Sequence, residues 1–252
     1  MVKKLARQVS LRNEADISGK DQLRAILSKG VDAFGPYWEY HLPLFITRQA
    51  LSRQLYFDNL YRQIVDVPGV ICEFGVQWGA SLATLANLRG IYEPYNYSRE
   101  LFGFDTFSGF SAVDTKDGDN CAVGDYSVTG GYEKELEQIL KLHEENAPLA
   151  HIPKFSLIKG DVSHTLPTWM EGNPHAVISM AIFDMDVYRP TKDALELVIP
   201  RLTRGSLLVF DELNCRAFPG ETQALSEVLG LDKLRLRRSP HQPYCSWAVW
   251  GD

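Results

Sequence analysis

Short runs of β-branched and aromatic residues alternate with stretches of helical periodicity from about residue 70 onward. This alternation is typical of parallel strands joined by crossover helices on both faces of a sheet. We expect strands over residues 70–74, 101–105, 155–159, 177–184, 207–211, 234–238 and 246–250. The last two form an antiparallel hairpin, because residues 239–243 are too short for a crossover helix. The pattern therefore predicts an α/β fold with a doubly wound, mostly parallel seven-stranded sheet and a C-terminal antiparallel hairpin.

Helical periodicity predicts the connections, over residues 80–88, 132–145, 166–170, 191–202 and 221–229. Before the first strand, Leu51, Leu55, Leu60 and Ile64 recur at helical spacing, which predicts an amphipathic helix within 45–64 whose apolar stripe packs on the core. Residues 1–36 are polar and charged except for a short amphipathic piece at 21–27, so we expect a mobile, loosely attached extension. We therefore expect an N-terminal helical extension or cap over 1–66 and a principal domain over 67–252.

Residues 107–131 interrupt this rhythm. They are rich in Gly, Asp, Ser and Thr, and they show no periodicity. The segment is longer than the usual connections of a compact domain, so it is either a functional lid or a disordered loop. We favour the lid.

Composition narrows the class of protein. Of the 252 residues 45% are hydrophobic, which suits a folded globular chain, and the net charge of −6 argues against a nucleic-acid partner. The four cysteines are scattered without a CxxC pair, which indicates reduced thiols rather than a zinc or disulfide framework. No secretory signal or membrane-spanning run is apparent. We expect a cytoplasmic protein without a membrane partner. The sequence does not determine the oligomeric state, but the N-terminal region and the C-terminal hairpin are candidate contact surfaces for a homo-oligomer.

A glycine turn follows the first expected strand. Gly75 and Gly79 allow a ligand to approach the backbone, and Ser81 with the amides at the helix start can hold an anionic group. The spacing departs from GxGxxG, so a dinucleotide is not the expected ligand. A tight strand-to-helix turn without a ligand is the alternative.

Acidic residues end the next two expected strands. Asp105, followed by Thr106, can accept both hydroxyls of a ribose, although turn capping would explain it equally well. Asp161 can accept a hydrogen bond from an adenine amino group while Val162 packs against the ring. In a doubly wound sheet such residues converge on the crevice at the carboxyl ends of the strands.

Two further strands end in Asp184 and in the pair Asp211 and Glu212. Mg²⁺ prefers oxygen ligands, and three carboxylates from neighbouring strand ends could supply them. Like charges repel, so a bound cation is the simplest reason for them to coexist. The alternative is that one or more of the three face solvent.

These motifs resemble known methyltransferases over roughly residues 70–229. Residues 73–81, EFGVQWGAS, resemble the first motif of metal-dependent O-methyltransferases of the catechol type. The segments DMDVYRPTKDAL at 184–195 and FDEL at 210–213 are more similar to the macrocin (TylF-like) sugar O-methyltransferases.

The resemblance implies a class I methyltransferase fold that binds S-adenosylmethionine. The methionine end would lie near Glu73, Gly75, Gly79 and Ser81, the ribose at Asp105 and Thr106, and the adenine at Asp161 and Val162. The metal would bind Asp184, Asp211 and Glu212.

The sequence departs from those families at the reacting groups. Val187 stands where the catechol-type enzymes have a catalytic lysine, and Glu212 stands where Asp or Asn is usual, so that coordination could pass through water. By position, Asp184 or Asp186 is the expected proton acceptor. His143 and His164 are alternatives.

The expected activity is Mg²⁺-dependent methyl transfer from S-adenosylmethionine to a sugar hydroxyl. The acceptor would be a deoxysugar, a nucleotide sugar or a glycosylated natural product. The alternatives are a relative of the cephalosporin hydroxylases, with the same fold and a different reaction, and a non-catalytic protein that binds S-adenosylmethionine.

Overall fold

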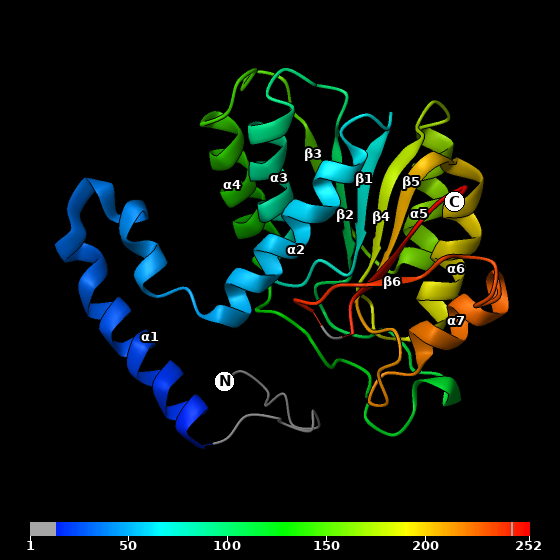
Figure 1. The fold of residues 1–252 in the computed structure, drawn as a ribbon, viewed down its shortest axis with the longest axis horizontal. Coiled ribbons are helices and arrows are strands. Elements are labelled where there is room, and N and C mark those ends of the chain that lie inside the picture. Colours follow the sequence, from blue (N-terminus) through cyan, green and yellow to red (C-terminus); the bar gives the residue numbers. More distant parts are fainter. Residues whose placement is uncertain (1–13, 243) are drawn as a thin grey trace.

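Seven strands form one sheet, in the order β3-β2-β1-β4-β5-β7-β6, in the computed structural model, which describes residues 14–242 and 244–252 (Figure 1). Strands β1 to β5 are parallel, whereas β7 is antiparallel to both β5 and β6. The bounds are β1 Val70–Phe74, β2 Leu101–Asp105, β3 Phe155–Lys159, β4 Ile178–Phe183, β5 Leu202–Phe210, β6 Arg237–Arg238 and β7 Ser246–Val249. The predicted fold class is confirmed.

The strand bounds differ from the predictions mainly near the C-terminal edge. β5 begins five residues earlier than predicted, because its first residues are partly exposed and interrupted by Gly205, which hides the strand pattern. β6 keeps only two of its five predicted residues, since Leu234 and Leu236 pack against the core instead of joining the ladder.

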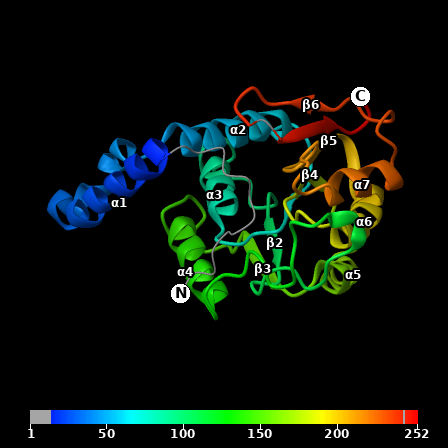
Figure 2. The same ribbon diagram turned by 90° about the horizontal axis from the view of Figure 1, so that it is seen from below.

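Helices cover both faces of the sheet (Figure 2). α2, α3 and α4 pack on one face, and α5, α6 and α7 pack on the other, each group with its own apolar cluster. The bounds are α2 Arg48–Ile64, α3 Ala80–Tyr92, α4 Tyr132–Glu145, α5 Val162–Gly172, α6 Tyr188–Val198 and α7 Gly220–Val228, with 3₁₀ turns at η2 Thr115–Asp117 and η3 Ile199–Arg201.

Helix α2 is present as predicted, but it turns a different face to the core. Leu60 and Ile64 are buried, whereas Leu51 and Leu55 are each 47% exposed, so half of the predicted stripe is wrong. The buried face runs instead through Phe57, one turn before Leu60 and Tyr61. An aromatic ring buries more apolar area than a leucine, which favours this rotation.

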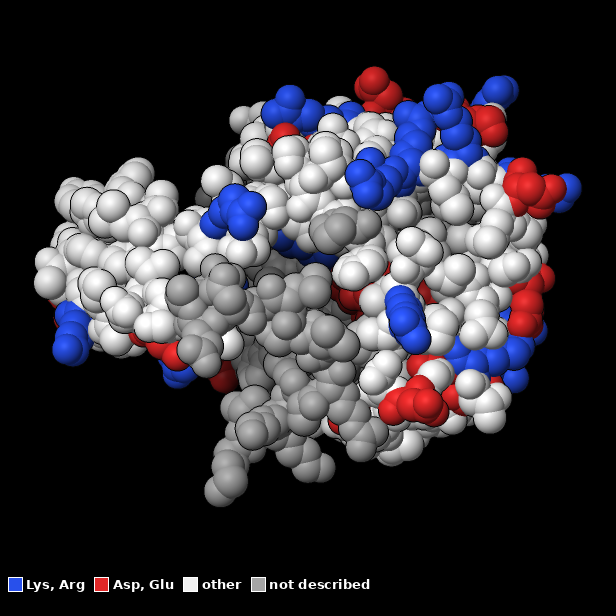
Figure 3. Space-filling view, turned by 60° about the horizontal axis from the view of Figure 1, so that its bottom comes forward, with Lys and Arg blue, Asp and Glu red and all other residues white. Residues whose placement is uncertain are grey.

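The segment before α2 projects from the body as an arm. It consists of α1, Glu14–Phe34, and η1, Gly35–Leu44 (Figures 1 and 3). The sequence predicted only a short helical piece at 21–27, because Gly19 and Gly30, which are poor helix formers, flank it. The expected mobility of the first 13 residues lies outside the described residues.

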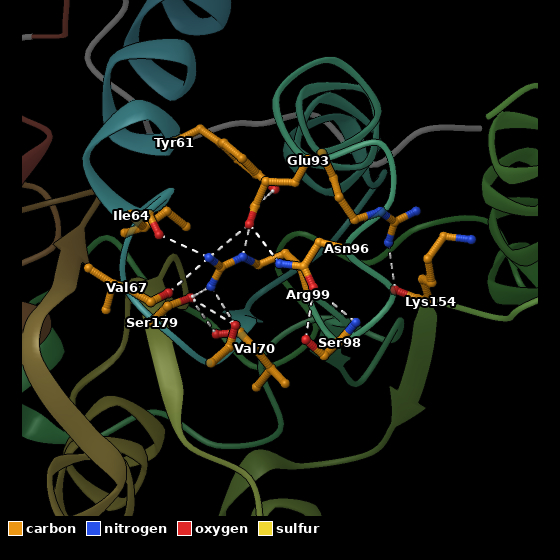
Figure 4. A network of polar contacts seen from close by, with 12 residues as sticks. Tyr61, Ile64, Val67, Val70, Glu93, Asn96, Ser98, Arg99, Lys154 and Ser179 are labelled. Carbon is orange, nitrogen blue, oxygen red and sulfur yellow. Dashed lines mark hydrogen bonds and ion pairs between the residues drawn. The ribbon is translucent and has the colours of Figure 1, made fainter. Parts of the chain in front are cut away.

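A buried arginine ties α2 to the sheet at the amino ends of its strands (Figure 4). The Arg99 guanidinium donates to the carbonyls of Ile64 at 2.9 Å and Gly69 at 2.5 Å, to Ser179 Oγ at 2.6 Å, and to both carboxylate oxygens of Glu93. One side chain thus joins the end of α2, the entry to β1 and the start of β4. We call these contacts of Arg99 the Arg99 node. They hold α2 in place relative to the sheet, and therefore also relative to the carboxyl ends of the strands.

Candidate active site

A cavity of about 450 Å³ lies at the carboxyl ends of β1 to β5, next to the point where the strand order reverses between β1 and β4. Ligands of doubly wound sheets bind at this position. The cavity wall includes every residue that the sequence predicted for the cofactor or the metal, and both aspartates that it predicted as proton acceptors. These are Glu73, Gly75, Gly79, Ser81, Asp105, Thr106, Asp161, Val162, Asp184, Asp186, Asp211 and Glu212.

The sheet itself positions the central acids. The Asp184 amide donates to the Phe74 carbonyl at 2.8 Å, and the Asp211 amide donates to the Phe183 carbonyl at 3.1 Å. Each ladder thus continues one residue beyond its strand and fixes an acid at the rim. Gly75 has a φ of +95°, and a Cβ there would lie 1.9 Å from the Asp184 carbonyl oxygen, so only glycine allows β1 to end this close to β4.

Asp105 fastens the glycine turn to the end of β2. Its Oδ2 accepts the Gln77 amide at 2.7 Å, and its Oδ1 accepts the Phe107 amide at 2.5 Å. The turn-capping role is therefore present in the structure. A carboxylate has about four lone-pair sites, so each oxygen can still accept a ligand hydroxyl.

Asp161 joins α5 to the 107–131 segment. Its Oδ1 caps α5 by accepting the Ser163 amide at 2.9 Å, and its Oδ2 accepts the Ser111 hydroxyl at 2.5 Å. Phe110 and Tyr126, whose ring centroids are 5.3 Å apart, line the cavity from the same segment. The segment is thus folded against the cavity wall.

Glu73 is buried at the end of β1, at 1% exposure, and its Oε2 has no hydrogen-bond partner. Burial raises the pKa of Glu73 well above its usual range, and the nearby Asp184 adds to the rise. An unpartnered carboxylate oxygen in the wall of a cavity is suited to a ligand that donates hydrogen bonds.

Burial and mutual repulsion disfavour the charged forms of the remaining acids in the cavity wall. Burial raises the pKa of Asp184 well above its ordinary value, and Asp211 raises it further. Burial likewise raises the pKa of Asp186, and it raises the pKa of Glu212 to about 7. Asp186 also has a φ of +62°, a conformation that side-chain-bearing residues seldom adopt. The group is therefore suited to bind a cation.

A cation already lies between two of these acids. Arg53 of α2 donates from Nη1 to Asp211 Oδ1 and from Nη2 to Asp184 Oδ2, the latter at 3.1 Å. It also contacts Ser81 Oγ at 3.5 Å and Cys245 Sγ at 3.2 Å. Burial lowers the pKa of Arg53, but the two carboxylates outweigh it and raise the pKa above the usual value.

Within the described residues, no three His, Cys, Asp or Glu side chains form a group that could hold a metal ion. The carboxylates of Asp184 and Asp211 surround the Arg53 guanidinium instead. The donor chemistry nevertheless fits a hard divalent cation, since Asp184, Asp211 and Glu212 offer carboxylate oxygens at the ends of two neighbouring strands and the first two already share one positive charge.

Sequence reasoning missed Arg53 entirely. One signal was available: residues 53, 57, 60 and 64 share a helical face, so a charged side chain stood in line with the buried positions of α2. The two histidines considered as proton acceptors, His143 on α4 and His164 on α5, do not line the cavity.

In the described part of the chain, no helix is long and apolar enough to span a bilayer.

Comparison with known proteins identifies similar chains. A sequence model of the macrocin-O-methyltransferase (TylF) family matches residues 51–228. The curated 8-demethyl-8-(2,3-dimethoxy-alpha-L-rhamnosyl)-tetracenomycin-C 4'-O-methyltransferase of Streptomyces olivaceus is 27% identical over an alignment of 159 residues, and the match covers 58% of this chain. The match spans about half, 53%, of that relative's length.

Solved structures of similar fold cover the whole chain. The crystal structure of the calicheamicin methyltransferase CalS11 is 41% identical, with a TM-score of 0.90, over 96% of this chain and 95% of that one. An apo structure of CalS11, described as a TDP-rhamnose 3'-O-methyltransferase, is 39% identical, with a TM-score of 0.83, over 96% of both chains. The O-methyltransferase NovP, 17% identical with a TM-score of 0.60 over 79% of both chains, shares the fold. The class I methyltransferase fold is thus confirmed.

Proposed function

Because the chain belongs to the macrocin-O-methyltransferase family, we propose that it transfers a methyl group from S-adenosylmethionine to a hydroxyl of a nucleotide-linked deoxysugar. The observation that carries this proposal is the single cavity at the strand ends, which unites the acidic residues, the glycine turn and Ser81. A volume of about 450 Å³ is within the usual range for a small-molecule site.

Similarity favours a nucleotide sugar over a finished glycoside as the acceptor. CalS11, described as acting on TDP-rhamnose, resembles this chain at about 40% identity over nearly its full length. The tetracenomycin methyltransferase, whose name specifies a rhamnosyl natural product, resembles it at 27% over 58% of the chain. A deoxysugar bound to a nucleoside diphosphate is therefore the acceptor class that we propose.

The donor would lie across β1, β2 and β3. The unpartnered Glu73 carboxylate suits the methionine ammonium group, and Ser81 at the start of α3 suits the methionine carboxylate. Asp105, beside Thr106, would accept the ribose hydroxyls through its remaining lone pairs.

At the far end of the donor, Asp161 would accept the adenine amino group, and Val162 would pack against the ring. The Asp161 oxygen already accepts the Ser111 hydroxyl. Adenine would therefore share this oxygen with Ser111 or displace the 107–131 segment slightly.

The acceptor would lie beside Asp184 and Asp186, where the chain positions its oxygen and removes its proton. We assign Asp186 as the proton acceptor when Asp184 binds metal, because both side chains line the cavity. Correct placement of the two reactants can be worth roughly 7–11 kcal/mol in well-oriented systems. S-adenosylmethionine supplies the electrophilic methyl group when bound.

We further propose that Mg²⁺ binds Asp184, Asp211 and Glu212. These three carboxylates line the cavity from the ends of β4 and β5, and oxygen ligands suit this ion. The ion would stabilise negative charge on the acceptor oxygen. Because Arg53 now joins two of the three, metal binding requires its side chain to withdraw.

The acceptor can be tested with S-adenosylmethionine that carries a deuterated methyl group. The protein is incubated separately with TDP-rhamnose, with other nucleotide deoxysugars and with rhamnosyl glycosides. The masses of the products are measured by mass spectrometry. We expect one labelled methyl group on a nucleotide sugar. Transfer to glycosides alone would overturn the acceptor assignment. Conversion without a labelled methyl group would indicate the hydroxylase-type alternative, and binding of the donor without any product would indicate a non-catalytic protein.

Metal dependence is tested separately by turnover in EDTA. We expect the rate to fall at least about tenfold, because the acceptor oxygen loses the stabilisation of its charge, and excess Mg²⁺ should restore it. Full turnover in the chelator would exclude the metal from the reaction, whatever the acceptor.

A further inference from the structure

Arg53 is the only Lys or Arg among the described residues that line the cavity. Seven acids share that wall, namely Glu73, Asp105, Asp161, Asp184, Asp186, Asp211 and Glu212. The Arg53 guanidinium forms hydrogen bonds with only two of these seven acids. Its two terminal nitrogens donate to Asp184 and Asp211, two of the three residues proposed to hold the metal.

We propose that Arg53 is an internal competitor of the divalent metal, which neutralises the Asp184–Asp211 pair until the ion displaces it. This inference rests on the metal site of the proposed function. A guanidinium and a divalent ion cannot both lie between the same two carboxylates, because like charges a few ångströms apart repel strongly inside a protein. The metal-free protein therefore avoids a half-buried pair of acids without a cation, and the ion replaces one cation by another.

The side chain has room to withdraw. It is 26% exposed, so its path toward solvent is not closed, and its guanidinium lies 4.8 Å from the centre of the Phe57 ring. That ring, buried one turn further along α2, can retain the cation after its carboxylate partners are lost. The backbone of α2 need not move, since the Arg99 node fixes its C-terminal end to the sheet.

The competition has a direct consequence for metal affinity. A metal that must displace Arg53 binds more weakly than it would to the same carboxylates without the arginine. A tenfold change in affinity corresponds to about 1.4 kcal/mol of binding free energy. We expect Arg53→Met, which keeps the length of the side chain and removes its charge, to tighten Mn²⁺ and Mg²⁺ binding by about tenfold.

The test measures metal binding without donor or acceptor, by calorimetry with Mg²⁺ and by electron paramagnetic resonance with Mn²⁺. Arg62→Met is the matched control, because Arg62 lies on the same helix and pairs with Asp58 at 3.1 Å on the surface. The control should bind metal as the wild-type protein does. Asp211→Asn in the Arg53→Met background should abolish the gain.

Thermal unfolding gives a second readout. Without metal, Arg53→Met should melt below the wild-type protein, because two half-buried carboxylates lose their cation. Mg²⁺ should raise the melting temperature of the variant more than that of the wild type. If Arg53→Met does not fold, Arg53→Lys keeps the charge but not the fork that spans both acids, and it should also bind metal more tightly.

Unchanged or weaker metal binding in a folded Arg53 variant would overturn the inference. The absence of metal binding in all of these proteins would overturn it as well. Neither result bears on the identity of the acceptor, which the labelled-product experiment measures independently. Conversely, tighter metal binding in a protein that methylates no sugar would support the role of Arg53 and contradict the proposed acceptor.

Discussion

Asp105 serves the local structure and, in our proposal, also binds the donor. Its carboxylate accepts two backbone amides, and Asp105 also lines the cavity. We expect Asp105→Asn to weaken S-adenosylmethionine binding about tenfold or more, since a hydrogen bond to a charged group contributes about 1.5–3 kcal/mol. Calorimetry with the donor alone measures the effect.

The control for this variant is Asp117→Asn. Asp117 is a buried carboxylate that accepts the amides of Tyr188 at 2.5 Å and Asp114 at 2.7 Å, and it does not line the cavity. It should affect stability without a comparable loss of donor affinity. Equal losses in the two variants would show that Asp105 has only the structural role.

Single residues were predicted well where the backbone pattern determines their place. Asp184 and Asp211 follow apolar runs, so the ends of their strands could be predicted, and parallel strands bring such ends to one edge. Arg53 could not be assigned in this way, because its contacts with those acids span 131 and 158 residues. Only its place on the buried face of α2 hinted at a role.

A buried ion pair stabilises the sheet at the amino ends of its strands. At the amino ends of the strands, Arg99 and Glu93 form a buried ion pair at 2.8 Å, and Tyr61 donates to the same carboxylate at 2.6 Å. Breaking such a pair by removing one partner commonly costs about 3–5 kcal/mol. We expect Glu93→Gln to lower the free energy of unfolding by this amount, measured by urea denaturation at pH 7.

The same pair has a pH dependence of known sign. Burial alone would raise the pKa of Glu93, but hydrogen bonds from Arg99, Tyr61 and Asn96 outweigh it and lower the pKa. Its stabilisation is therefore complete above the unfolded pKa of about 4.3 and is lost as the pH falls through the lower folded value.

Glu93→Gln should lack this acid-dependent loss of stability. Glu145→Gln, which removes an exposed partner of Lys141, should change stability by less than about 1 kcal/mol. If both variants lost the same stability, the buried network would not have the importance that we give it.

Elements with strong periodicity were predicted to within a few residues, and those without it were not. β1, β2, β3 and α4 coincide with their predicted ranges, because apolar alternation or a continuous helical stripe marks them. Only part of α1 was predicted, because Gly19 and Gly30 interrupt the pattern of its 21-residue helix. The rotation of α2 depended on tertiary packing of its aromatic side chains, which periodicity alone does not specify.

At the scale of the whole molecule, the residues that stabilise the sheet and the residues proposed for catalysis lie at opposite ends of the strands. The buried Arg99 node holds the amino ends of β1 and β4, whereas seven acids, with Arg53 as their only lysine or arginine among the described residues, gather at the carboxyl ends. The arm of α1 and η1 exposes apolar side chains such as Ile26, Trp38 and Tyr40. Association into a homo-oligomer, a cytoplasmic location and the absence of a nucleic-acid or membrane partner stay predictions.

The central claim is that one cavity holds the methyl donor and a divalent ion side by side. A crystal structure of the protein with S-adenosylhomocysteine and Mn²⁺, with anomalous differences recorded for the metal, tests it most directly. We predict a manganese peak bonded to Asp184 and Asp211, the Arg53 side chain displaced from them, and ribose hydroxyls on Asp105. A nucleoside bound outside this cavity would contradict the account. So would a nucleoside bound in the cavity with Arg53 still between the two aspartates and no manganese peak.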